Sequence, residues 1–138
     1  MGVDISGYPY NHTDMRKSDA PPFAGAVDPS AVEKAAEQVL TADDAARLTS
    51  LLSLLADPVR VRILDALESV GELCVGDLAL ALGVNEDATS YALRLLRTAG
   101  LVQSRKVGRT VVYRLADEFP EPLLAHCLRE LIKLSRAV

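Results

Sequence analysis

The sequence predicts a mainly helical (α+β) domain with five to six helices and one β-hairpin near its C-terminal end. Three observations predict it: apolar residues recur at helical spacing, capping residues bound the apolar segments, and one alternating run is divided by a glycine. The 138 residues suffice for a single core. We expect an N-terminal arm over residues 1–27, rich in Gly, Pro, Asp, Asn and Ser, and a folded domain over residues 28–138.

Polar capping residues mark the helix starts in the first half of the chain. Asp28 precedes a proline and predicts a helix to about Leu40. Thr41 begins a segment that resembles a capping box, which predicts a second helix that ends near Asp57. Asp57 again precedes a proline and predicts a third helix over about residues 58–69.

A tight turn joins the next two helices. A short extended piece, residues 72–74, leads into a helix over about residues 75–82, which Gly83 ends. Asn85 caps the following helix, over about residues 86–99. Two short helices separated by three residues fit a helix-turn-helix unit, whose second helix enters the major groove of DNA.

A hairpin and a last helix follow the helix-turn-helix. Residues 101–106 and 110–115 alternate around a turn at 107–108, which predicts a β-hairpin. In this position the hairpin is the wing of a winged helix-turn-helix. The last helix, over about residues 120–136, has a broad apolar face formed by Leu123, Leu124, Cys127, Leu128, Leu131 and Leu134.

Side chains able to contact DNA gather on the second helix of this unit and on the hairpin. Hydroxyl and guanidinium groups hydrogen-bond base edges and phosphates, and the hairpin tip suits a flanking backbone or minor groove. We expect five residues of the helix to face the core: Ala88, Ala92, Leu95, Leu96 and Ala99. The predicted DNA-contacting residues are Thr89, Ser90, Tyr91, Arg94 and Arg97 on its outer surface, and Lys106 and Arg109 on the hairpin.

The charge distribution favours nucleic acid despite a formal net charge of −4. Residues 1–57 hold nine acids and four bases, a balance of −5, whereas residues 89–116 hold six bases and no acid. Screening confines an electrostatic contact to about 8–10 Å, so a locally basic surface on an acidic protein can still neutralise phosphates. The alternative is a basic face that contacts only solvent.

The sequence disfavours several function classes. No apolar stretch approaches the ~20 residues of a membrane-spanning helix, and we expect no signal peptide. No motif supplies a glycine-rich phosphate loop or a nucleophile–base pair, so an enzyme is not expected. Cys74 and Cys127 make no disulfide framework, which favours a reducing compartment, the cytoplasm.

Four segments of the chain carry a resemblance to a known family. In chain order they are LADPVRVRIL (55–64), ELCVGDLA (72–79), LRLLRTAGLV (93–102) and GRTVVYRL (108–115). From about Leu48 onwards the chain resembles the ArsR/SmtB family of metal-sensing repressors. The resemblance implies a homodimer built from the first and last helices, which binds double-stranded operator DNA without inducer and releases it when metal binds. Ser90-Tyr91-Ala92 departs from the Ser-His-Gln or Ser-His-His triplet that the family often has here.

The resemblance places one metal site at the start of the helix-turn-helix. Cys74 and Asp77 match a family pair that accepts further ligands from the partner's N-terminal arm. A thiolate and a carboxylate within one helical turn can share a tetrahedral ion such as Zn²⁺ or Cd²⁺. The arm has no cysteine, so His12 and Asp14 are its candidate donors. The alternative is that Cys74 is a small buried apolar residue and Asp77 a first-turn acid.

The resemblance places a second metal site on the last helix. Asp117 matches one family ligand, and His126 and Glu130 lie four residues apart on one helix face. These residues allow a rearranged site that includes Asp117 of the partner subunit; otherwise His126 is a surface or interface histidine. Two further alternatives stay open: a thiol-based redox repressor that uses Cys74 and Cys127, and a winged helix that binds protein rather than DNA.

Overall fold

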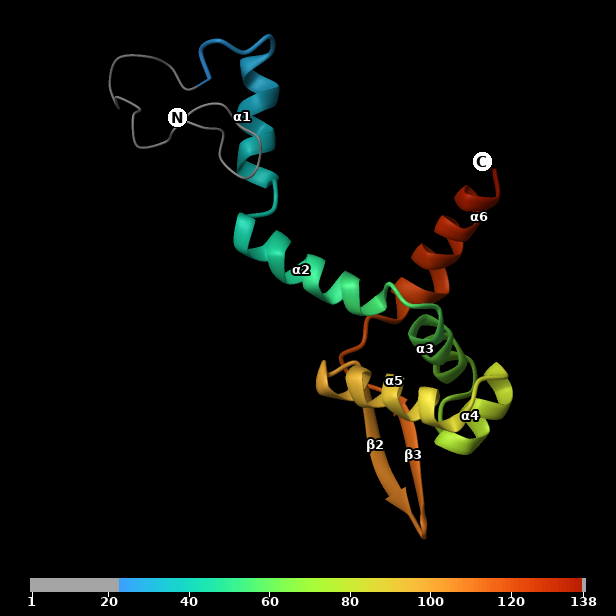
Figure 1. The fold of residues 1–138 in the computed structure, drawn as a ribbon. Helices are drawn as coiled ribbons and strands as arrows, with labels where there is room; N and C mark the ends of the chain where they lie inside the picture. The colour runs from blue at the N-terminus through green and yellow to red at the C-terminus, as the bar shows by residue number, and fades with distance from the viewer. Residues whose placement is uncertain (1–22, 138) are drawn as a thin grey trace. The chain divides into compact units, whose positions relative to one another are not determined.

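The computed structural model describes residues 23–137 and confirms the predicted fold class (Figure 1). Most of the predicted N-terminal arm, residues 1–27, lies outside the described residues. The chain divides into two compact units, Met1–Leu48 and Thr49–Val138. The elements in chain order are α1 (Pro29–Gln38), α2 (Ala42–Leu55), α3 (Pro58–Val70), β1 (Leu73–Cys74), α4 (Val75–Leu82), α5 (Glu86–Thr98), β2 (Val102–Val107), β3 (Thr110–Leu115), η2 (Leu123–Leu128) and α6 (Arg129–Ala137).

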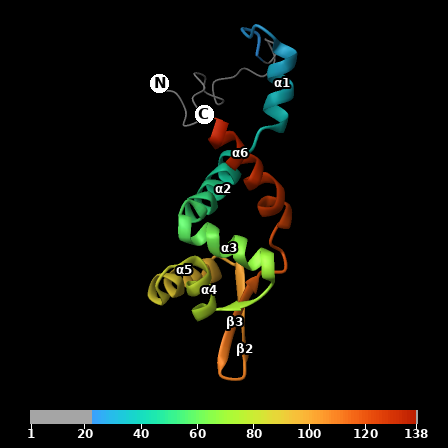
Figure 2. The same cartoon turned by 90° about the vertical axis from the view of Figure 1, so that its right-hand side faces the viewer.

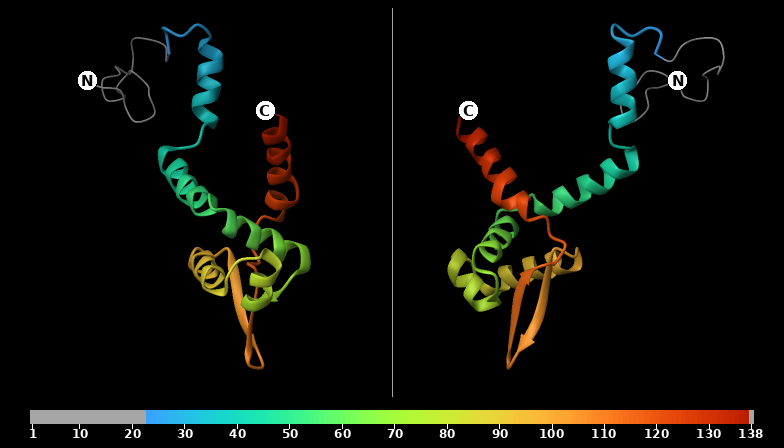
Figure 3. Two further views of the ribbon diagram at one scale, coloured as in Figure 1. Left: turned by 45° about the vertical axis from the view of Figure 1, so that its right-hand side comes forward. Right: turned by 180° about the vertical axis from the view of Figure 1, so that it is seen from behind.

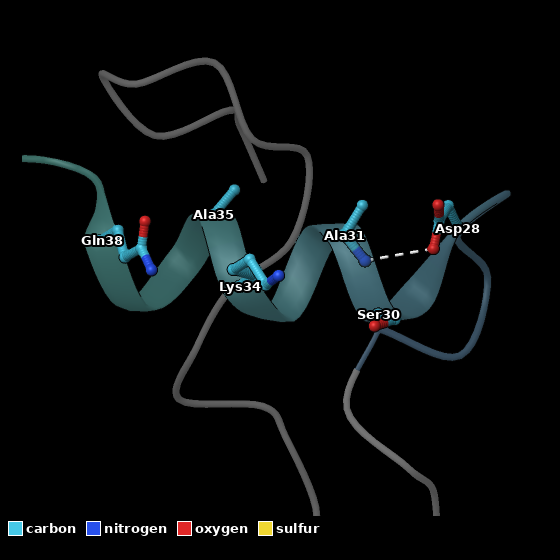
Figure 4. A pocket seen from close by; sticks show the side chains of 6 residues that line it. All are labelled: Asp28, Ser30, Ala31, Lys34, Ala35 and Gln38. Carbon is cyan, nitrogen blue, oxygen red and sulfur yellow. Dashed lines mark hydrogen bonds between the residues drawn. The ribbon is translucent and has the colours of Figure 1, made fainter.

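The described part of the first unit consists of a capped helix and the start of a second one. The Asp28 carboxylate accepts a hydrogen bond from the Ala31 backbone N–H (3.1 Å) and so caps α1 (Figure 4). The Thr41 hydroxyl accepts one from the Asp44 N–H (3.1 Å) at the start of α2. Both predicted helix starts are confirmed. No residue of α1 is buried, and the six side chains drawn in Figure 4 all belong to this helix and its cap.

The core lies in the second unit, where α3, α4 and α5 gather at one end of the hairpin (Figure 2). Each of these helices turns an apolar stripe inward, and β2 closes the core from the sheet side. The fully buried apolar side chains are Ile63, Leu64, Leu67, Leu78, Leu93, Leu96 and Val102. Within residues 23–137 no helix has both the length and the apolar character needed to cross a membrane.

The sheet has three strands rather than the two of a simple hairpin. Their order is β1-β3-β2, with both neighbouring pairs antiparallel. The short extended piece predicted before α4 is β1, and it pairs with β3 through Leu73 opposite Tyr113 and Cys74 opposite Val112. The chain that enters α4 is therefore tied to the middle of the hairpin.

The hairpin turn lies one residue later than the predicted 107–108. Val107 pairs with Thr110, which leaves Gly108 and Arg109 as a two-residue loop. Gly108 has a φ of 62°, as type II′ turns require at their first central position. The prediction is wrong because Val107 still belongs to β2. The two strands project beyond the helices in both views of Figure 3.

The last helix is not uniform in its winding. Leu123–Leu128 form a π-helical segment, η2, which α6 continues over Arg129–Ala137. The prediction of one helix over about residues 120–136 is right in extent and wrong in winding. Six residues make fewer than two turns, so apolar spacing does not separate i→i+5 from i→i+4 hydrogen bonding there.

Candidate nucleic-acid interface

Capping interactions fix the three-residue turn between α4 and α5. Gly83 ends α4 with a φ of 69°, a conformation that glycine adopts without strain. The Asn85 side-chain oxygen accepts a hydrogen bond from the Ala88 N–H (2.7 Å) and starts α5. Leu78 and Leu82 of α4 pack in the same core as the inner face of α5. The predicted caps are confirmed, and the two helices form the predicted helix-turn-helix.

α5 turns one stripe inward and leaves the opposite side to solvent. Its buried residues follow spacings of three and four: Thr89, Ala92, Leu93 and Leu96. Four predicted outer residues are exposed as expected: Ser90, Tyr91, Arg94 and Arg97. The predicted inner face is wrong at two positions, because Leu93 is buried and Ala99 is exposed. The buried stripe lies on a slightly different side of the helix from the one predicted.

Thr89 is not on the outer surface, contrary to the prediction. Its residue exposure is 0%, and its hydroxyl donates a hydrogen bond to the Asn85 backbone carbonyl (2.9 Å). A threonine four residues after a helix start satisfies its hydroxyl within its own helix in this way. The Thr89 side chain therefore supports the turn and does not face a groove.

The two arginines of α5 are held in different ways. The Arg94 guanidinium lies over the Tyr91 ring, 5.6 Å from the ring centroid, within cation–π range. Arg97 Nη1 donates a hydrogen bond to the Ser104 hydroxyl of β2 (3.3 Å). Arg94 is thus oriented by a neighbour on its own helix, whereas Arg97 is oriented toward the hairpin. Ser104 is not among the predicted site residues, because only the packing of β2 against α5 reveals its role.

The hairpin presents two cations where it projects furthest from the helices. Lys106 and Arg109 are exposed, and Arg109 lies in the turn itself. The neighbouring Gly108 adds no side chain beside them. Both predicted wing residues therefore lie at the tip of the hairpin.

The base-rich stretch is less positive in the structure than in the sequence. Arg105 donates hydrogen bonds to both carboxylate oxygens of Glu72 (2.9 and 2.7 Å), and Arg114 donates one to Asp117 (2.9 Å). The hydrogen bond from Arg105 lowers the pKa of Glu72, and the same bond raises the pKa of Arg105. Among the described residues of α5 and the hairpin, four cations have no acidic partner: Arg94, Arg97, Lys106 and Arg109.

Two of the three residues predicted for the first metal site lie at the start of α4. Cys74 is half-buried and occupies the N-cap position, but its side chain makes no capping hydrogen bond. Asp77 is exposed in the first turn of the same helix. His12 lies outside the described residues. A free thiol and a free carboxylate suit a thiophilic divalent ion, yet they are only two of the four ligands that a tetrahedral site needs.

The second predicted group is spread over the turn after β3 and the two helical segments η2 and α6. Asp117 pairs with Arg114, and Glu130 of α6 pairs with Lys133 (2.9 Å). His126 is exposed in η2. Within residues 23–137 of one chain, no three His, Cys, Asp or Glu residues form a cluster that could hold a metal ion. Both predicted sites take a ligand from a partner subunit, so they stay predictions.

Comparison with known proteins identifies relatives among bacterial regulators. Residues 57–104 match the family model described as "Bacterial regulatory protein, arsR family". The chain is 46% identical over 86 residues to the "Transcriptional repressor SmtB homolog" of Synechocystis. The aligned residues make up 62% of this chain and 64% of the relative. The chain is 44% identical over 85 residues to the "HTH-type transcriptional regulator NmtR" of Mycobacterium tuberculosis, covering 62% of this chain and 70% of the relative.

A solved structure supports the same assignment. The crystal structure of the AntR antimony-specific transcriptional repressor superposes with a TM-score of 0.60 at 28% sequence identity, covering 81% of this chain and 95% of that one. The match to the Synechocystis relative spans slightly less than two thirds of that protein's length. These relatives are regulators of transcription and not enzymes, as the sequence predicts. The chain belongs to the ArsR/SmtB family of winged helix-turn-helix transcriptional regulators.

Proposed function

We propose that the chain is a homodimeric repressor that binds operator DNA through α5 and the hairpin and releases it when a transition or heavy metal ion binds. One observation carries the DNA-binding part. Four exposed cations of α5 and the hairpin have no acidic partner in the described residues: Arg94, Arg97, Lys106 and Arg109. Unpaired cations on one recognition helix and its wing suit the phosphates that flank a groove.

The contacts of the arginines suggest different roles within this surface. Arg94 lies over Tyr91 on the exposed side of α5, so its guanidinium is oriented before DNA arrives and suits a guanine edge. Arg97 is directed by Ser104 toward β2, where Lys106 and Arg109 follow along the hairpin. We assign base reading to Arg94 and Ser90, with Tyr91 beside them, and phosphate contacts to the other three cations.

Two substitutions separate these roles. The full chain is first used to select a preferred duplex from a random library, and affinities for this duplex and for an unrelated one of equal length are then compared. Arg94→Ala should reduce the preference at the contacted base pair by about 1–3 kcal/mol. Arg97→Ala should weaken binding to both duplexes alike. It should also reduce the slope of log K against log salt concentration, the salt slope, by about 0.9. Unchanged binding in both variants contradicts the assignment of α5 as the recognition helix.

Dimerisation is proposed from apolar residues that the second unit leaves exposed. In α6, Leu131, Ile132 and Leu134 are 56%, 42% and 64% exposed. In α2, Leu51 and Leu52 are 37% and 51% exposed. Large apolar residues left exposed on a small domain mark an interaction surface. A second copy of the chain is the proposed partner, because a two-fold dimer presents two α5 helices to the two halves of a palindromic operator.

The inducer site is proposed at the start of α4. Cys74 and Asp77 supply two ligands, and His12 from the partner's arm is the candidate third. When bound, Zn²⁺ or Cd²⁺ would link the arm to this helix. Because three residues join α4 to α5, a restraint at the start of α4 acts close to the recognition helix. The relative named for antimony supports a metal or metalloid inducer. Metal shifts DNA binding only by its different affinity for the free and DNA-bound forms.

A further inference from the structure

We propose that Glu72 sets the strength of DNA binding: its carboxylate neutralises Arg105 on the wing and so limits the attraction of the wing to DNA phosphates. The inference rests on the proposed DNA-binding function. It concerns the residue directly before β1, which belongs neither to the recognition helix nor to the hairpin. Its partner, Arg105, is 33 residues away in the sequence.

The contact between these side chains is bidentate. Arg105 Nε donates to Glu72 Oε2 at 2.9 Å, and Arg105 Nη2 donates to Glu72 Oε1 at 2.7 Å. Two parallel hydrogen bonds fix both the distance and the orientation of the guanidinium. The strand order β1-β3-β2 makes the pair possible, since Arg105 and Cys74 both lie opposite Val112 of the central strand. Glu72 directly precedes β1 and lies two residues before Cys74, the spacing at which side chains of an extended chain share a face.

Without Glu72, the Arg105 charge would add to the cations at the hairpin tip. Arg105 directly precedes Lys106, and Val107 is the last residue of β2. At about 3.4 Å per residue, Arg105 lies about 7 Å along the strand from Val107, the last residue before the turn. This distance is within the Debye length of about 8 Å at physiological ionic strength. An unpaired Arg105 would thus add to the positive charge of the hairpin, on the opposite face of β2 from Lys106.

Fold stability alone does not account for the pair. The Arg105 side chain is 58% exposed and that of Glu72 35%, and ion pairs this exposed stabilise a fold little. Charge neutralisation has a larger consequence at a DNA-binding surface. Each phosphate contact strengthens binding to every sequence, whereas base contacts strengthen binding to one. Removing a wing cation from the phosphate contacts therefore weakens binding to every duplex alike and leaves the choice of sequence to the base contacts.

The test measures the affinity of the chain for two duplexes over a range of salt concentrations. The probes are the duplex that the wild-type chain selects from a random library and an unrelated duplex of equal length. For Glu72→Gln we expect stronger binding to both duplexes, a slope of log K against log salt steeper by about 0.9, and an unchanged preference for the selected duplex. The steeper slope amounts to about 3.5-fold between 50 and 200 mM salt.

Two variants show whether the effect comes from Arg105. The double variant E72Q/R105Q should return to the wild-type slope, because the freed cation is gone. Glu37→Gln removes one exposed acid of α1 and should leave slope and preference unchanged. A Glu72→Gln protein that folds, by circular dichroism, and keeps the wild-type slope and affinity overturns the inference. Weaker binding of Glu72→Gln to both duplexes overturns it as well, because the pair then positions the wing. A wild-type chain that binds neither duplex overturns the proposed function itself.

Discussion

α5 and α6 are both amphipathic, but one chain buries them to different extents. α5 has four buried residues among its thirteen. α6 has none, although Leu131, Ile132 and Leu134 lie on it. The recognition surface is therefore positioned by contacts within a single chain, whereas α6 has apolar side chains that this chain does not cover.

The start of α4 resembles α6 in this respect. Cys74 and Asp77 supply two metal donors, and within the described residues no third one joins them. The elements that hold α5 are thus complete in one chain, and the elements assigned to dimerisation and metal binding are not. Experiments that separate these two groups test the account.

The largest expected effect concerns the core that holds α5. Leu96 is 0% exposed, so Leu96→Ala should cost about 2–5 kcal/mol in the free energy of unfolding, independent of protein concentration. Leu134, which is 64% exposed, is the matched control. Leu134→Ala should alter stability mainly through dimer formation, so its effect should depend on concentration. Urea unfolding at two protein concentrations distinguishes them. If both variants lose the same free energy of unfolding, and the loss does not depend on protein concentration, the contrast between α5 and α6 is contradicted.

The second effect concerns dimerisation. Leu131→Glu places a charge among the exposed apolar residues of α6 and should give a folded monomer with much weaker operator binding. Leu80, a leucine of α4 that is 82% exposed, provides the control, because Leu80→Glu should stay dimeric. Light scattering measures both masses. A wild-type chain that is monomeric at micromolar concentration contradicts the proposed dimer.

The third effect concerns metal binding. Cys74→Ser should abolish operator release by Zn²⁺ or Cd²⁺ and the near-ultraviolet absorbance of a thiolate complex, while binding without metal persists. Cys127→Ser alters an exposed cysteine of η2 and should respond like the wild type. His12→Ala should weaken metal binding less than Cys74→Ser. If Cys74→Ser responds to metal as the parent does, then Asp117, His126 and Glu130 are the next candidates.

The smallest expected effect separates two helix caps that each accept a hydrogen bond from the backbone N–H three residues further on. Asn85 caps α5, so Asn85→Ala should cost about 1 kcal/mol of stability. Asp28 caps α1, which has no buried residue, so Asp28→Ala should leave the unfolding of the core unchanged. Chemical denaturation followed by far-ultraviolet circular dichroism measures the free energy of unfolding of both variants. A larger loss for Asp28→Ala would show that α1 contributes to the core.

Local signals in the sequence predicted the recognition unit well. The range 75–82 predicted for α4 matches the observed helix, and α5 ends at Thr98, one residue before the predicted end. Gly83 and Asn85 account for this success, because caps act within a few residues of the chain. The side of α5 that faces inward was harder to predict, since both candidate stripes hold apolar residues and packing decides between them.

Contacts between distant segments were not predictable from these signals. The pairing of β1 with β3 depends on register, and only this register brings Glu72 to Arg105. The sequence shows six bases without an acid over residues 89–116, so it overstates the positive charge of the wing. Burial of Thr89 likewise follows from its hydrogen bond to Asn85, which residue type alone does not indicate.

The central claim, that α5 and the hairpin form the DNA-binding surface, is tested most directly by the salt dependence of duplex binding. The variant carries alanine at Arg94, Arg97, Lys106 and Arg109, and Arg62→Ala, an exposed arginine of α3, is the control. The slope of log K against log salt should fall by about 0.9 for each cation that contacts phosphate, and the preference for the selected duplex should be lost. The Arg62 control should keep both properties. A folded quadruple variant with the wild-type slope and preference would contradict the claim.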